Sequence, residues 1–166
     1  MKKLQWKSKS FSGEYMILDK ELQVGSLKNS FLSSKTNGVL NDTKVVFKSK
    51  GILKQYIEII KAGTDDVIGV ITFGSFMSKA KIIINGTSYN WKYTNSWNTK
   101  WRVSIENGVD INYNKKNTKG TIESNVDDSL LMLIGLYINN YYIQTMAVVL
   151  LVIFLPTWIN LFNIWG

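Results

Sequence analysis

The 166-residue sequence contains no cysteine, no histidine and a single proline. Without cysteine there are no disulfides and no thiolate chemistry, and without histidine there is no imidazole acid–base catalysis. The usual zinc ligand sets are excluded by the same two absences. Charge is also missing from one part of the chain, because no charged residue follows Asp128. The sequence therefore consists of a lysine-rich first part and an uncharged last part.

The charges are unequal in sign, with 20 basic and 12 acidic side chains and a formal net charge of +8. Every basic residue except Arg102 is a lysine, and asparagine and isoleucine are abundant. An AT-rich genome encodes such a composition, which favours a bacterial source and explains the basicity in one interpretation. In the other interpretation, the excess of lysine attracts an anionic surface, either lipid or nucleic acid.

Residues 3–124 form a succession of short segments that are separated by turn residues. Eleven strand candidates follow one another at spacings near ten residues: LQWKS, EYMIL, LQVGSL, TKVVFKS, QYIEIIKA, DVIGVITF, AKIIIN, TSYNWKY, TKWRVSIE, VDINYN and GTIES. The segment KNSFLSSKTNGVLND is the only long polar interruption, and no stretch before Asp127 has helical periodicity. The pattern predicts a mainly-β fold, either a meandering antiparallel barrel or a sandwich.

Two hairpins have registers that the sequence predicts. In AKIIINGTSYNWK, a two-residue Asn-Gly turn pairs Ile82 with Tyr89 on one face and Lys79 with Lys92 on the other. In KWRVSIENGVDINYN, a two-residue loop would mix polar and apolar side chains on each face. A three-residue Glu-Asn-Gly loop with the glycine left-handed keeps the faces separate, and a slip of one residue would flip every side chain. We therefore expect the three-residue loop.

These registers place a group of cations on the outward face of the two hairpins. The group consists of Lys79, Lys81, Lys92, Lys100 and Arg102. Lys79 directly opposite Lys92 is a like-charge pair, which destabilises a sheet. A solvated and screened surface is one interpretation of the group. The other is an anion site for a lipid phosphate, and the five side chains are the candidate lipid-binding residues.

The uncharged tail is expected to divide at Asn139-Asn140. Residues 129–143 are apolar on almost every side at first, which is typical of a helix buried in protein or lipid. They give roughly 22 Å of helix, which is short for a membrane core of about 30 Å but comparable with a small barrel. Residues 143–162 are apolar and lead into tryptophans, so they are a candidate membrane-inserted segment. A second buried helix, or a helix that covers one end of the barrel, is the alternative.

The lysine-rich β-domain runs directly into a wholly hydrophobic helix, DDSLLMLIGLYI, after the segments VIGVITFGS and YNWKYTNSWNTKW. On these features it resembles the tubby C-terminal-like superfamily, which includes phospholipid scramblases and LURP-one-related proteins. The resemblance covers residues 3 to about 143. It implies an antiparallel closed barrel of 11–12 strands filled by the hydrophobic C-terminal helix. It also implies an intracellular, membrane-associated, non-enzymatic domain, with lipid headgroups as ligands of some members. No family motif matches position by position, so the resemblance assigns no binding residues.

Motifs for catalysis are missing from the sequence. It has no G-x-x-x-x-G-K phosphate loop and no G-x-S-x-G elbow. The acidic pairs Asp65-Asp66 and Asp127-Asp128 fit a turn and a helix start, so neither predicts a metal site. No serine has a histidine partner, which leaves a lysine-activated serine as the open alternative. We therefore expect neither enzymatic activity nor a cofactor.

Three tryptophans alternate with basic residues in NWKYTNSWNTKWR, as they do on platforms that stack nucleic-acid bases. Trp91 and Trp101 fall on the apolar faces of the predicted hairpins, which favours core packing over base stacking. Trp97 lies in the connecting loop and is expected to be free. No nucleic-acid partner is expected.

The sequence favours a non-enzymatic, membrane-associated β-barrel module that binds anionic lipid headgroups through its lysine-rich face; it identifies no protein partner. The expected domains are 1–143, a barrel with the core helix 129–143, and 144–166, a hydrophobic membrane-inserted or capping segment. The basic start MKKLQWKSKS lacks the apolar run of a signal peptide, and the lysines precede the hydrophobic segment. The positive-inside rule then places the β-domain on the cytoplasmic side of a bacterial inner membrane. The alternative is a soluble β-barrel that binds a small apolar ligand, with the whole tail buried.

Overall fold

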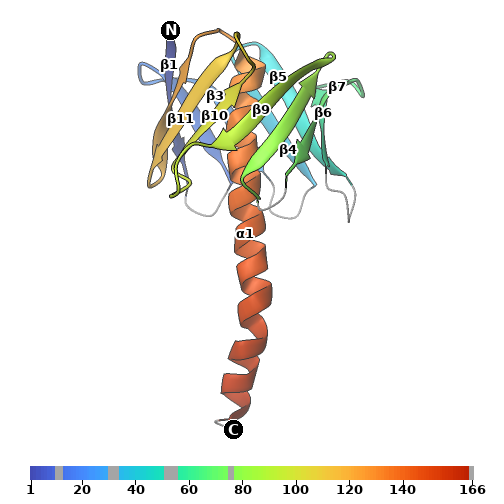
Figure 1. Ribbon diagram of the computed structural model, residues 1–166, viewed down its shortest axis with the longest axis vertical. Coiled ribbons are helices and arrows are strands. Elements are labelled where there is room, and N and C mark those ends of the chain that lie inside the picture. Colours follow the sequence, from blue (N-terminus) through green and yellow to red (C-terminus); the bar gives the residue numbers. More distant parts are fainter. Residues whose placement is uncertain (10–12, 30–33, 51–55, 75–76, 165–166) are drawn as a thin grey trace.

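The computed structural model describes residues 1–9, 13–29, 34–50, 56–74 and 77–164, with side chains as far as Leu155. Twelve antiparallel strands form a closed barrel, in which each strand pairs with its neighbours in sequence and β1 closes the barrel against β12. The strands are β1 (Lys2–Ser8), β2 (Tyr15–Asp19), β3 (Leu22–Asn29), β4 (Lys35–Leu40), β5 (Thr43–Lys50), β6 (Tyr56–Lys61), β7 (Val67–Phe73), β8 (Lys79–Ile84), β9 (Thr87–Tyr93), β10 (Lys100–Ser104), β11 (Asp110–Lys116) and β12 (Lys119–Ser124). The helix α1 (Ser129–Ile164) passes through the barrel and protrudes from it (Figure 1). The predicted mainly-β closed barrel filled by a C-terminal helix is therefore confirmed.

The sequence predicts a long polar interruption over residues 28–42, and this is wrong for Lys35–Leu40, while residues 30–33 lie outside the described residues. Strand β4 lies there and pairs with both β3 and β5. Its inward face consists of Thr36, Gly38 and Leu40, all of them buried. A Cβ atom on Gly38 would lie 3.1 Å from the ring of Phe47, so the glycine makes room for a core aromatic side chain. Pairing on both sides therefore outweighs the weak strand propensity of the letters TNG.

Both predicted hairpin registers are confirmed. Lys79 pairs with Lys92 across β8 and β9, and Trp101 pairs with Tyr113 across β10 and β11. The predicted left-handed residue of the second loop is wrong, because Asn107, with φ of 54°, takes that conformation and Gly108 does not. The β9–β10 pairing also shows that the two hairpins are neighbours in the barrel.

The barrel interior is filled by the first part of α1, of which every residue from Leu131 to Asn140 is buried. Side chains of three strands contact α1 around Gly135. The indole Nε1 groups of Trp91 and Trp101 both donate to the Gly135 carbonyl oxygen, at 3.1 and 3.0 Å. The Tyr113 hydroxyl is within hydrogen-bonding distance of the Leu131 and Met132 carbonyl oxygens, at 3.1 and 3.2 Å. A side chain at Gly135 would overlap the Tyr113 ring, so glycine sets the distance between helix and wall.

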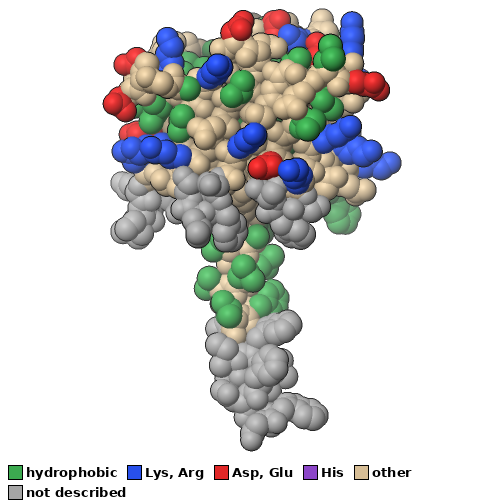
Figure 2. Space-filling model, turned by 180° about the vertical axis from the view of Figure 1, so that it is seen from behind, with side chains coloured by type: hydrophobic (Ala, Val, Ile, Leu, Met, Phe, Trp, Pro, Cys, Tyr) green, Lys and Arg blue, Asp and Glu red, His purple; other side chains and the backbone are tan. Residues whose placement is uncertain are grey.

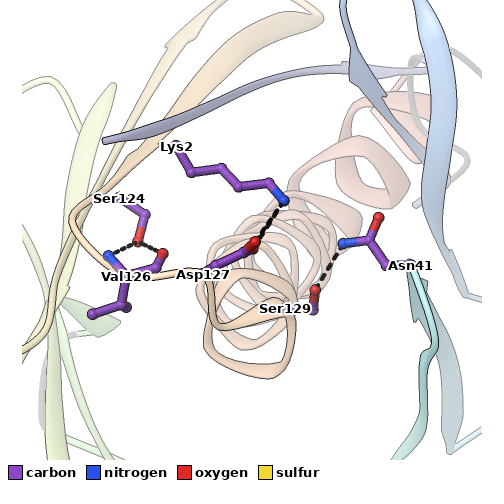
Figure 3. A network of polar contacts seen from close by, with 6 residues as sticks. All are labelled: Lys2, Asn41, Ser124, Val126, Asp127 and Ser129. Atoms are coloured by element: carbon purple, nitrogen blue, oxygen red, sulfur yellow. Dashed lines mark hydrogen bonds and ion pairs between the residues drawn. The ribbon is translucent and has the colours of Figure 1, made fainter.

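The start of α1 is fixed by polar contacts at one end of the barrel. Asp128 caps the helix, since its Oδ1 accepts the backbone N–H three residues on at 2.9 Å. The Lys2 ammonium pairs with Asp127 at 2.9 Å, and Asn41 donates from Nδ2 to the Ser129 hydroxyl at 3.0 Å (Figure 3). These bonds connect β1 and the β4–β5 turn to the helix start. They establish the direction in which α1 enters the barrel.

Contrary to the predicted division at Asn139-Asn140, α1 is one continuous helix. Both asparagines are buried in the barrel, where the Tyr93 hydroxyl donates to Oδ1 of Asn139 at 3.1 Å. The change along α1 is one of exposure, because Tyr142 is buried and Ile143 is exposed. The polar letters therefore mark the level at which the helix leaves the barrel. The side chains of Trp158 and Trp165, expected at a membrane interface, lie outside the described residues.

Candidate functional site

The two ends of the barrel are distinguished by α1. We call the end at which α1 begins the far end and the end from which it protrudes the exit end (Figure 1). Strand β1 runs from the far end, where Lys2 contacts Asp127, to the exit end at Ser8. Because all neighbours are antiparallel, odd-numbered strands run toward the exit end and even-numbered strands run away from it. Each described charged residue can thus be placed between the two ends from its position in a strand or connection.

The two ends carry opposite charge. Among the described residues, the exit end carries Lys7, Lys9, Lys28, Lys35, Lys48, Lys50, Lys79, Lys92, Lys100, Lys115, Lys116 and Lys119 against only Glu14 and Glu58. The far end carries Lys2, Lys3, Lys20, Lys44 and Lys61 against Asp19, Glu21, Asp42, Asp65, Asp66, Glu106, Asp110, Glu123, Asp127 and Asp128. Lys81 and Arg102 lie between the two sets. In Figure 2 blue side chains form a band near the protruding helix, and most red side chains lie toward the opposite end.

The residues that the sequence predicts as an anion site do share one outward face. Lys79, Lys92 and Arg102 form one row across β8, β9 and β10, since each pairs directly with the next. Lys79 and Lys81 also line a shallow hollow of about 230 Å³ on β7, β8 and β9. Lys100 begins β10 at the exit end. The geometry therefore brings the five cations to neighbouring strands, and their binding of an anion stays a prediction.

Arg102 differs from the four lysines because it has an acidic partner. Its Nε lies 2.6 Å from Oδ1 of Asp110, to which Asn112 also donates at 3.0 Å. Both side chains of the ion pair are partly exposed, so the pair is solvent-screened and worth little in stability. It nevertheless neutralises the charge of Arg102. The unpaired positive charge of this face therefore comes from its lysines.

Trp97 is exposed at the exit end, on the connection between β9 and β10. Its relative exposure is 85%, which confirms that it is free of the core, whereas Trp91 and Trp101 are buried as predicted. Asn95 fixes the loop, because its Oδ1 accepts the backbone N–H groups of Thr99 and Lys100 at 3.0 Å each. An ordered loop thus presents a large aromatic side chain beside lysines.

Beyond the exit end, the described side chains of α1 are exposed rather than packed against the strands. The described side chains from Met146 to Leu155 are all exposed, for example Val152 at 64%. Residues 143–164 give roughly 33 Å of helix, which matches a membrane core of about 30 Å. By length and composition α1 passes as a membrane-crossing helix, a test that a buried core helix can also pass. Burial in a protein core does not explain the apolar character of the described residues from Met146 to Leu155, because their side chains are exposed.

The barrel interior offers hydrogen bonding rather than acid–base chemistry. Burial raises the pKa of Tyr93 to about 12, so its hydroxyl stays a neutral donor to Asn139. Burial also lowers the pKa of Lys115, the half-buried lysine near the exit end. Within the described residues, no group of three or more acidic side chains is placed to hold a metal ion. The feature that distinguishes the molecule is its exit end.

Sequence prediction misses most of the lysines at the exit end. The sequence predicts a register for only two hairpins, and it does not predict how the other strands are oriented relative to the helix. A signal was nevertheless present, since the connections after even-numbered strands contain DKE, ND, TDD and EN, whereas lysines flank the connections after odd-numbered strands. Reading the sign of charge strand by strand would have separated the two ends.

No protein-family model, curated protein or solved structure matches this chain. The resemblance to the tubby C-terminal-like superfamily therefore stays a prediction.

Proposed function

We propose that this protein is a membrane-anchored β-barrel that binds an anionic lipid surface with its exit end and acts as a binding module rather than an enzyme. Residues 143–164 of α1 cross the bilayer, and the barrel lies on its cytoplasmic side. The observation that carries the proposal is the division of charge between the ends. The basic end is the one from which the uncharged apolar helix emerges.

Electrostatics gives this arrangement a preferred orientation. Each lysine near an anionic leaflet contributes about 1 kcal/mol, and the attraction falls off within a Debye length of about 10 Å. Strands of five to eight residues hold the two ends of the barrel roughly 20 Å apart. The acidic far end is therefore screened from the membrane while the exit end is attracted to it.

Two further features fit the same orientation. Trp97 lies at the exit end, and tryptophan is enriched at the membrane–water interface because its ring is amphipathic. The lysines all precede the apolar part of α1, and no charged residue follows Asp128 in the sequence. The positive-inside rule then keeps the barrel in the cytoplasm, where the leaflet is anionic.

The alternative, a soluble barrel that binds a small apolar ligand, requires the whole tail to be buried. The described side chains beyond Thr145 are exposed instead, and α1 occupies the interior in which such a ligand would bind. No observation favours this alternative.

Membrane fractionation of the full-length protein tests the anchor. We expect the protein to stay with the membrane fraction in 1 M salt and in an alkaline wash, because the uncharged segment 143–164, which is long enough to cross the membrane core, holds it there rather than charge. Release by salt alone would show a surface-bound protein without a membrane-crossing helix. Appearance in the soluble fraction before any wash would contradict the proposal.

Single cysteines test the orientation, since the natural sequence has none. Thr118→Cys lies in the β11–β12 turn at the exit end and Thr87→Cys begins β9 at the far end; both positions are exposed. With a fluorophore attached and the protein in anionic vesicles, a headgroup-bound quencher should reduce emission strongly at position 118 and weakly at position 87. Equal quenching at both positions would contradict the proposed orientation.

A further inference from the structure

A hollow of about 470 Å³ lies on the outer wall at the exit end, on strands β1, β11 and β12. It is separate from the predicted cation face on β8, β9 and β10. Its lining includes three lysines, Lys7, Lys116 and Lys119, together with Trp6 and Gly120. Sequence reasoning did not group these residues, which come from the two ends of the barrel domain's sequence.

The three lysines form one row across adjacent strands. Lys7 pairs with Lys119 across β1 and β12, and Lys119 pairs with Lys116 across β12 and β11. All three are exposed. Directly paired residues on one face of a sheet have Cβ atoms about 4.5–5.5 Å apart, so flexible lysine side chains in such a row can reach one point. Two consecutive like-charge pairs also destabilise the sheet unless an anion lies between them.

No acidic residue is among the described residues that line the hollow, so none of them balances this charge. Elsewhere at the exit end, Lys9 pairs with Glu14 and Lys50 with Glu58. Within the described part of the chain, none of the three lysines forms an ion pair. The next row of paired residues is neutral, consisting of Gln5, Thr121 and Asn114. The site therefore combines three positive charges with uncharged hydrogen-bonding side chains.

The tryptophan below the hollow carries a donor that the protein leaves unused. Nε1 of Trp6 is buried and has no hydrogen-bond partner among the described residues. A Cβ atom on Gly120 would lie 2.7 Å from Cε2 of Trp6, the ring atom bonded to Nε1. The edge of the indole thus packs directly against the Gly120 backbone that lines the hollow. Trp6 is fully buried and faces the core, where its ring centroid lies 6.2 Å from that of Trp101, so the indole supports the wall beneath the hollow and its Nε1 is not a ligand of the site.

We infer that this hollow binds a phosphate group, as a monoester or diester, through charge-assisted hydrogen bonds from Lys7, Lys116 and Lys119. Free phosphate and a lipid headgroup share this chemistry. The choice of a lipid headgroup as the occupant rests on the proposed function, which brings the exit end to the membrane. The site differs from the general attraction of the exit end because it is saturable and takes one phosphate group per chain.

Calorimetric titration of the full-length protein in a neutral maltoside detergent tests the site. The probes are inorganic phosphate and dihexanoyl phosphatidic acid, a short-chain lipid with a phosphate monoester. The variant is Lys116→Gln/Lys119→Gln, and the matched control is Lys35→Gln/Lys48→Gln, which removes the same charge from a like-charge pair at the same end but outside the predicted cation face. We expect saturation at one phosphate per chain and a loss of at least about tenfold in affinity in the variant alone.

The outcomes separate the possible explanations. Tighter binding of the lipid than of inorganic phosphate supports the headgroup as occupant, whereas equal binding assigns free phosphate to the same three lysines. An equal loss in variant and control, or no saturation, overturns the site, since the exit end would then attract anions only by net charge. Lys7→Gln alone should weaken binding in the same direction, which serves if the double variant is unfolded. Membrane fractionation and headgroup quenching of the cysteine variants test the proposed function independently of this result.

Discussion

The two parts of α1 are alike in composition and different in surroundings. Residues 129–142 and 143–164 are both apolar and both free of charge, yet the first part fills the barrel and the second protrudes from it. What differs is partnership. In the first part, Gly135 accepts a hydrogen bond from Trp91 and leaves room for the Tyr113 ring, and Asn139 accepts a hydrogen bond from Tyr93. Hydrophobicity alone therefore does not separate a core helix from a lipid-facing one, whereas positions that need a specific neighbour do.

Shortening the chain is the strongest way to break this comparison. A chain that ends at Gln144 should unfold cooperatively in urea, whereas one that ends at Asp128 should not fold. Removal of the buried part exposes the inward face of every strand, a loss that exceeds the 5–15 kcal/mol typical of the whole stability of such a domain. A cooperative transition of the shorter chain would show that the barrel does not depend on α1.

Gly135→Ala sharpens the comparison at a single position. Because the new methyl group would overlap Tyr113, we expect a loss of about 3 kcal/mol in the free energy of unfolding. The intrinsic helix propensity has the opposite sign, since alanine stabilises a helix over glycine by about 1 kcal/mol. Ala147→Leu, at an exposed position of the same helix, should change stability by less than about 0.5 kcal/mol. Thermal unfolding in detergent measures both, and a stabilised Gly135→Ala would contradict the contact.

The two ends of the barrel can be compared in the same way. Changing Lys79, Lys81 and Lys92 together to glutamine should cost the chain that ends at Gln144 about 3 kcal/mol of affinity for anionic vesicles. Changing Lys20, Lys44 and Lys61 removes the same charge from the far end and should have little effect. Co-sedimentation at low and high salt measures both. Equal losses would mean that net charge, and not its location, governs binding.

High pH should destabilise the barrel, whose buried tyrosines ionise only when it unfolds. Tyr93 has a pKa of about 12 in the folded protein and about 10 when unfolded. A raised tyrosine pKa means that stability is full below pH 10 and is lost as pH rises toward 12, by about 2 kcal/mol for this residue. Tyr93→Phe should have a shallower loss of stability over that range in urea titrations. If wild type keeps its stability at pH 11, the hydroxyl is not buried as described.

Trp97→Ser should have the smallest effect on stability, within about 0.5 kcal/mol, because the side chain is 85% exposed. In the chain that ends at Gln144 the other tryptophans are in the barrel, so a blue shift of emission on adding anionic vesicles would report Trp97. We expect that shift in wild type and its absence in the variant. A shift that persists in the variant would assign it to another tryptophan.

How much of this the sequence could predict depends on how local the cause is. The register of β8 and β9 follows from an Asn-Gly turn and an alternating pattern, both of which are local. Strand β4 was missed because its glycine and asparagine are tolerated only by two paired neighbours and the Phe47 ring. The sequence alone predicts a break at Asn139 because the partner of this side chain, Tyr93, is 46 residues away. The hollow at Lys7 and Lys119 depends on the closure of the barrel, which joins residues more than a hundred positions apart.

The strictly consecutive order of the strands has a consequence for how such a chain can change. Each connection lies at the opposite end of the barrel from the one before it. Successive connections in the sequence therefore contribute alternately to the exit end and to the far end. By sequence, four of the six connections after odd-numbered strands contain an aromatic residue, and none of the five between an even-numbered strand and the next strand does. Gain or loss of a whole hairpin preserves this parity. Gain or loss of a single strand would move every later connection to the opposite end, and α1 would then begin at the exit end. The even number of strands is therefore itself under constraint.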